Sequence, residues 1–457
     1  MRLTGNLGGR MRQLYGRYGQ SVLLKSGTWY LGSTVLERGL SFLGVIIFSR
    51  LLTREEYGTV AIFLSWFSIF AATITLNVNS SITNAKYDVP EEKFDQFVSS
   101  ISTLGILAGL VAIGVLLLLP DAVIDSVFGV ERLFLFLAAT VATAELSVKS
   151  IMVVWQVTYQ YRFRSVVGVI LAGGRLLLSV ILIATPFLFA GDNALARIMG
   201  IAVVGVILGT YFFSRILYIG RVFVNLPYWR YALRFSVPLI PHVLMGFVLA
   251  HFDRILIDRY IGREETGLYT FAYQLGEIVM LVWFALNSAW VPWFYEQMNK
   301  GAYDHIRRRA TQYLLGYFAL ISALIVSAPL LVRLLGPPEF EVSMAVVPVV
   351  MGGLFFNLPY SLFTNVEFFE KRTIYISIGT GAAAILNVVL NIWLLPVLGY
   401  VAAAWTTLVS YVALFVFHAL IVRYRLRSPL QLNFWLAVLL GGVITLISAL
   451  VFIATSN

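Results

Sequence analysis

The sequence predicts an all-α protein that crosses a membrane many times. Its 457 residues are 59% hydrophobic and only 12% charged, which is more apolar sequence than a water-soluble core needs. The apolar residues form long continuous runs, unlike the alternating ten-residue segments of a membrane β-barrel. Because the backbone of a lipid-exposed segment must be hydrogen-bonded internally, such runs indicate membrane-spanning helices.

Twelve to thirteen apolar runs are each long enough to cross a hydrocarbon core of about 30 Å. The first run lacks the small-residue cleavage site of a signal peptide, so we expect it to be retained as a helix. The predicted spans are 27–49, 57–80, 97–119, 132–160, 165–188, 195–218, 235–260, 265–292, 309–334, 343–368, 373–396, 400–422 and 431–453.

The basic residues predict the orientation of these spans. With the N-terminus in the cytoplasm, 22 of the 33 Lys and Arg residues fall in cytoplasmic segments and seven in outer loops. This asymmetry is the positive-inside bias of multi-pass proteins of the cytoplasmic membrane. It accounts for the net charge of +10 without a nucleic-acid partner.

A motif after the first span recurs in the second half of the chain. RLLTREEYG begins at Arg50, and RYIGREETG begins 209 residues later at Arg259. Six spans therefore repeat as six, and because six is even, both copies enter from the same side and the repeat is parallel. We expect two six-helix lobes around a central cleft. The predicted segments are a cytoplasmic basic N-terminus at 1–25, lobes at 26–218 and 235–426, a cytoplasmic amphipathic linker at 219–234 and an extra C-terminal helix at 427–457.

Four basic residues fall inside the predicted spans, where ionisable side chains are costly and mark functional sites. We predict that they face the cleft and bind an anionic ligand, because a fork of guanidinium donors suits phosphate. Structural ion pairs are the alternative for Arg38 and Arg175. Lys149 lies four residues after Glu145, which is the spacing of an intrahelical salt bridge. Arg254 is close enough to the outer surface for its guanidinium to snorkel into the interface. In chain order the four residues are Arg38, Lys149, Arg175 and Arg254.

Five further residues are candidates for coupling to an ion or a proton, since a carboxylate in apolar surroundings is readily neutralised. Glu277 is predicted to be isolated mid-span, with a salt bridge to Arg254 as the alternative. Asp253 is predicted to face away from Arg254. The five candidates are Glu37, Glu145, Asp253, Glu277 and His251.

Four stretches, in this order and on this topology, resemble the polysaccharide (Wzx-type) flippases of the multidrug/oligosaccharidyl-lipid/polysaccharide exporter superfamily. They are RLLTREEYG, SVPLIPH, DRILIDRYIGREETGLY and GYVAAAWTT. The resemblance implies export of a polyprenyl-linked, anionic oligosaccharide, as in O-antigen and lipopolysaccharide biosynthesis, by alternating access. It further implies membrane lipid, an ion or proton gradient, a polysaccharide polymerase and glycosyltransferases as partners.

Two other functions stay open at this point. One is a cation-coupled multidrug exporter (an antiporter) of the same superfamily, and the other is a membrane glycosyltransferase or polymerase. The chain has no phosphate-binding P-loop motif and no zinc motif of the HExxH type, so we expect no ATP hydrolysis, no metal and no cofactor. No long outer loop carries paired carboxylates, and we therefore expect a transporter without catalytic residues, not an enzyme.

Overall fold

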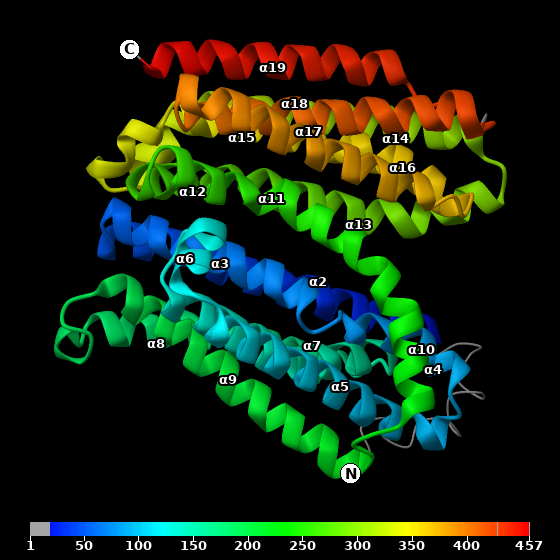
Figure 1. The fold of residues 1–457 in the computed structure, drawn as a ribbon. Coiled ribbons are helices and arrows are strands. Elements are labelled where there is room, and N and C mark those ends of the chain that lie inside the picture. The colour runs from blue at the N-terminus through cyan, green and yellow to red at the C-terminus, as the bar shows by residue number, and fades with distance from the viewer. Residues whose placement is uncertain (1–18, 427, 457) are drawn as a thin grey trace. The chain divides into compact units, whose positions relative to one another are not determined.

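The computed structural model describes residues 19–426 and 428–456, and every regular element within these ranges is helical (Figure 1). Twelve helices of the described chain are long and apolar enough to cross a membrane. The first predicted span lies in α2 (Gly19–Leu51), which is not one of the twelve. The predicted all-α membrane fold is confirmed, whereas most of the predicted basic N-terminus lies outside the described residues.

The contacts divide the chain into two units, residues 1–44 with 62–244 and residues 45–61 with 245–457. The first unit holds most of α2 and α3 (Arg54–Thr73), then α4 (Ile82–Asp88), α5 (Glu91–Leu118), α6 (Asp121–Val123), α7 (Arg132–Val157), α8 (Tyr161–Ile183), α9 (Asn193–Gly220) and α10 (Leu226–Ser236). The second holds most of α11 (Ile240–Tyr260), then α12 (Arg263–Gly276), α13 (Ile278–Asn299), α14 (Tyr303–Leu335), α15 (Val346–Phe355), α16 (Asn357–Phe369), α17 (Ile374–Leu398), α18 (Val401–Leu420) and α19 (Phe434–Ser456).

In the first unit, α7 packs against α5 and α9, and α9 also packs against α8. Small residues allow the close approach: a Cβ atom on Gly209 of α9 would collide with the backbone of Ala144 in α7. Phe97 and Ile151 are among the fully buried side chains of the resulting core. This packing fixes the relative positions of the charged residues that α7 and α8 carry.

Helix α10 occupies the stretch where the sequence predicts an amphipathic linker, and it is anchored to the first unit. Asn225 caps its N-terminus by accepting a hydrogen bond from the backbone of Tyr228. The indole of Trp229 donates to the carbonyl of Ser100 at 2.9 Å, and the Tyr231 hydroxyl donates to Asp88 at 2.6 Å. The helix therefore has a defined place on α5 and at the C-terminal end of α4.

In the second unit, two predicted spans are broken helices. The span predicted over 343–368 consists of α15 and α16, which meet at Phe356. Pro359 explains the break, because its nitrogen has no hydrogen to donate to the carbonyl four residues earlier. The span predicted over 265–292 consists of α12 and α13, which meet at Glu277. The predicted continuous helix over 265–292 is therefore wrong, and Glu277 lies exposed at the junction of the two helices.

The turn between α2 and α3 is fixed by its own side chains. Thr53 and Glu56 form a capping box, with the Thr53 amide donating to the Glu56 carboxylate at 2.8 Å and the Glu56 amide donating to the Thr53 hydroxyl at 3.2 Å. The guanidinium of Arg50 donates to the carbonyl of Leu335 at the end of α14, at 2.6 Å. The repeated motif thus caps a helix and docks it within the second unit.

The two copies of the motif meet at their glycines. A Cβ atom on Gly58 of α3 would collide with the carbonyl of Arg263, and one on Gly267 of α12 would collide with the carbonyl of Arg54. Each Cβ would also lie 3.1 Å from the amide nitrogen of the opposite glycine. The contact is reciprocal, since both glycines and both arginines are equivalent in the repeat. The spacing that the two copies of the motif share therefore allows α3 and α12 to approach each other closely.

Candidate functional site

Three charged residues gather around one aromatic ring in the first unit. Glu145 of α7 forms an ion pair with Arg175 of α8. The Arg175 guanidinium and the Lys149 ammonium each lie 5.9 Å from the centre of the Phe67 ring. The predicted alternative of an intrahelical Glu145–Lys149 salt bridge is wrong, because the carboxylate reaches across to α8 instead. Arg175 has no acid within one turn of its own helix, and it finds its partner on a neighbouring one.

This arrangement leaves Lys149 without an acidic partner. Glu145 is 3% exposed, and α9 approaches it so closely that a Cβ atom on Gly205 would lie 2.7 Å from its carboxylate oxygen. A carboxylate buried this deeply needs a cation beside it, and Arg175 supplies one. Among the described residues, no carboxylate lies within 4.0 Å of the half-buried Lys149 ammonium, whose contact is the face of Phe67. An ammonium in this setting is available to an anion.

Glu37 and Arg38 lie side by side on α2 and are both half-buried. The Glu37 carboxylate packs directly on Gly168 of α8, at a position where any Cβ atom would collide with it. It interacts electrostatically with Arg164 of α8 and with Arg38. Glu37 thus belongs to the α2–α8 contact, while the role predicted for Arg38 stays a prediction.

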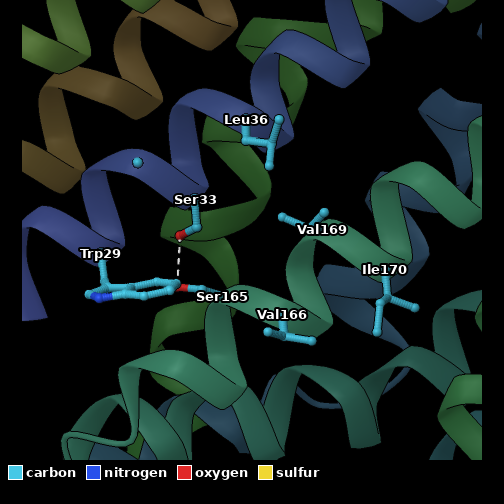
Figure 2. A pocket seen from close by; sticks show the side chains of 8 residues that line it. Trp29, Ser33, Leu36, Ser165, Val166, Val169 and Ile170 are labelled. Atoms are coloured by element: carbon cyan, nitrogen blue, oxygen red, sulfur yellow. Dashed lines mark hydrogen bonds between the residues drawn. The ribbon is translucent and has the colours of Figure 1, made fainter.

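Helices α2 and α8 also enclose an apolar groove of about 530 Å³ (Figure 2). The Ser165 hydroxyl donates to the Ser33 hydroxyl at 3.0 Å and joins the two helices. Trp29 and Val166 are 46% and 51% exposed on the two sides, and the guanidinium of Arg162 lies 5.9 Å from the Trp29 ring centre. The groove therefore combines apolar walls with a cation at one end. Its lining residues are Trp29, Gly32, Ser33, Leu36, Ser165, Val166, Val169 and Ile170.

In the second unit, Asp253 and Arg254 form a buried ion pair. One Asp253 oxygen accepts from the Arg254 amide at 2.9 Å and from its guanidinium at 3.1 Å, and the Tyr269 hydroxyl donates to the other. The Arg254 guanidinium lies 4.4 Å from the Tyr273 ring centre, and the side chains of Asp253 and Arg254 are only 1% and 5% exposed. The prediction that Asp253 faces away from Arg254 is wrong, as is the alternative in which Arg254 snorkels. Nearby, His251 stacks on Phe247, with ring centres 6.1 Å apart.

Hydrogen bonds continue from this ion pair into α17 and α18. Tyr269 is hydrogen-bonded to Thr407, and the Asn387 amide donates to Thr407 at 3.3 Å. Asn391 donates to Asn387 at 3.1 Å and accepts from the Thr406 hydroxyl at 2.9 Å. These hydrogen bonds join the polar side chains of α17 and α18.

Sequence reasoning missed one buried pair completely. His418 of α18 lies 2.7 Å from the Glu367 carboxylate of α16, and both side chains are fully buried. Because its partner is 51 residues away on another helix, no local pattern reveals the contact.

Comparison with known proteins identifies the family. Residues 23–298, more than half of the chain, match the family model described as polysaccharide biosynthesis protein. The chain belongs to this family. A protein of the Lsg locus of Haemophilus influenzae is 22% identical to this chain. The match covers 78% of this chain and 87% of that protein. The predicted resemblance to the polysaccharide branch is confirmed.

Solved structures show where the fold belongs. The lipid II flippase MurJ, in an inward closed conformation, matches with a TM-score of 0.70 and 13% identity over 92% of this chain and 97% of that chain. An inward-facing multidrug resistance MATE transporter matches with a TM-score of 0.62 and 12% identity, over 86% and 96% of the two chains. This chain is therefore a multi-pass membrane protein, and it has the same fold as these flippases and transporters.

Proposed function

We propose that the chain is a flippase that moves a polyprenyl-linked, anionic oligosaccharide from the inner to the outer face of the cytoplasmic membrane, with its N-terminus in the cytoplasm. The observation that carries the proposal is Lys149, a half-buried cation beside Phe67 with no acidic partner in the described chain. The family and the flippase fold support the same conclusion.

Lys149 and Arg175 attract the phosphate groups or acidic sugars of the cargo. In the empty protein, Glu145 compensates Arg175. When an anionic cargo binds, the Arg175 guanidinium gives up part of its interaction with Glu145 and contacts the cargo instead. At the same time Lys149 gains its first anionic partner. Binding therefore changes the charge balance of α7 and α8, which a transporter needs if cargo is to shift its conformational equilibrium. No covalent bond of the cargo changes.

The aliphatic chain of the carrier lies in the groove between α2 and α8. Its apolar walls provide burial for a lipid chain, and Arg162 at the Trp29 end provides a cation for the phosphate. We place Arg38 and Arg254 among the residues that attract the cargo. Coupling to an ion or a proton is assigned to Glu37, Glu145, Asp253, Glu277 and His251.

Filling the groove should impair export. Ile170→Trp places a bulky ring in a groove-lining position, and we expect a roughly tenfold loss of export because displacing a bound chain costs on the order of 1–3 kcal/mol. The measurement is surface glycan per molecule of protein in the membrane. Leu177→Trp is the matched control, since Leu177 is 65% exposed on the same helix but does not line the groove. Equal export by both variants would remove the groove from the proposal.

The experiment that tests the function compares cells with and without this chain. We expect loss of the chain to stop surface glycan display and to leave lipid-linked repeat units inside, with no change in resistance to cationic drugs. The fold match to MATE transporters favours a second candidate, a multidrug exporter. Changed drug resistance with normal glycan display would establish that candidate, and sugar transfer by the purified protein would instead establish an enzyme.

A further inference from the structure

Three buried carboxylates, one in the first unit and two in the second, form ion pairs with different kinds of basic side chain. Glu145 is paired with Arg175, and Asp253 with Arg254. A guanidinium keeps its proton at every physiological pH, so these two carboxylates have a permanent counter-charge. Glu367 is paired with His418, and imidazole is the side chain that gains and loses a proton near neutral pH. The Glu367–His418 pair is thus suited to carry an exchangeable proton.

The pair has no other compensation. The Glu367 carboxylate and the His418 Nδ1 atom lie 2.7 Å apart, and both side chains are 0% exposed. Within the described chain, the second Glu367 oxygen and the His418 Nε2 atom have no hydrogen-bond partner. Leaving buried polar atoms unpaired costs on the order of 1–3 kcal/mol each, and such atoms call for an explanation when a fold retains them. A transient water molecule would satisfy them.

A glycine and two aromatic rings lie close to the His418 imidazole. Helix α17 presents Gly379 to the imidazole, where any Cβ atom would collide with Nε2. Helix α18 presents the Phe417 ring, and α16 presents the Tyr360 ring 5.1 Å from the imidazole centre. Tyr360 is the titratable group among these neighbours, whereas Arg423 and Arg425, on the π-helical turn after α18, are exposed.

We propose that Glu367 and His418 form a further proton-binding site that drives transport. One proton shared between carboxylate and imidazole makes the pair neutral. Its release to water leaves a net charge of −1, which is costly for two fully buried side chains. Release and uptake consequently require a conformation that admits water, and this requirement ties proton movement to the transport cycle. The coupling role rests on the proposed function, but proton binding itself does not.

Infrared difference spectroscopy of the purified full-length protein tests proton binding directly. Between pH 5 and pH 9 we expect a carboxyl band of the wild type that Glu367→Gln removes and that the control Glu92→Gln, at an exposed carboxylate of α5, retains. His418→Gln keeps a hydrogen-bond donor but not a titratable group, and should move the pH at which the band appears by about one unit or more. An unchanged spectrum in both Glu367→Gln and His418→Gln would overturn the proposal. Thermal unfolding of each variant, monitored by circular dichroism, identifies any that does not fold.

Export measurements then test the coupling. Wild-type export should fall when a protonophore dissipates the proton gradient, and the slower residual export of Glu367→Gln and His418→Gln should not respond to it. Protonophore sensitivity equal to that of the wild type would contradict the coupling role. If the wild type shows the carboxyl band but moves no lipid-linked oligosaccharide, the proposed function fails and the proton site stands.

Discussion

Gly58→Ala and Gly267→Ala should each lower the thermal unfolding midpoint substantially. At both positions the added methyl group would collide with a backbone carbonyl, of Arg263 in the first case and of Arg54 in the second. Backbone cannot move aside as the end of a flexible side chain can, so α3 and α12 must separate. Overpacking of this kind costs on the order of 1–3 kcal/mol. The measurement is thermal unfolding of the purified protein in detergent, followed by circular dichroism.

Gly316→Ala is the matched control for this prediction. Gly316 lies in α14 with nothing within 4 Å of the position that a Cβ atom would occupy, so alanine should be neutral or stabilise the helix by up to about 1 kcal/mol. The double variant of Gly58 and Gly267 should cost less than the sum of the two single changes, because both disrupt one contact. Midpoints of the single variants that equal the midpoint of Gly316→Ala would contradict the close approach of the two helices.

Lys149→Met should reduce export about 10- to 100-fold. The substitution keeps the length and the apolar stem of the side chain and removes its charge. Hydrogen bonds to charged groups are worth roughly 1.5–3 kcal/mol, and each 1.36 kcal/mol corresponds to a factor of ten in rate. The measurement is surface glycan display by cells in which this chain is the sole source of export.

Lys149→Arg separates charge from other effects of the substitution. It retains a cation over Phe67 and should keep most of the export activity, although the planar guanidinium does not reproduce the geometry of an ammonium. Equal export by Lys149→Met and the wild type, at equal amounts of protein in the membrane, would show that the cation cluster does not bind cargo.

The sequence predicted the fold class because apolar content and helix length are local properties. It also located the ionisable residues of α7, α8 and α11, since an ionisable residue in an apolar run is visible without knowledge of tertiary structure. It did not predict which partner each residue would choose. Glu145 has Lys149 on its own helix but pairs with Arg175 on another, because the packing of α7, α8 and α9 brings the guanidinium to the buried carboxylate.

Helix breaks and long-range pairs were equally outside the reach of the sequence pattern. Glu277 lies in an apolar run that predicts a continuous helix, yet the chain divides there into α12 and α13 and exposes the carboxylate. Glu367 and His418 meet only because α16 and α18 are neighbours. The repeated motif was visible from its spacing, but the reciprocal contact of Gly58 and Gly267 depends on how α3 and α12 cross.

The most direct test of the central claim is transport in liposomes that contain only the purified protein and a fluorescent polyprenyl-pyrophosphate oligosaccharide. Exposure of the labelled head group at the opposite face is followed by quenching with a membrane-impermeant reductant. We expect the head group to be exposed rapidly with the wild type and more slowly with Lys149→Met. Protein-free liposomes give the background rate of exposure. Exposure with the wild type that is no faster than in protein-free liposomes would contradict the claim that this chain is a flippase.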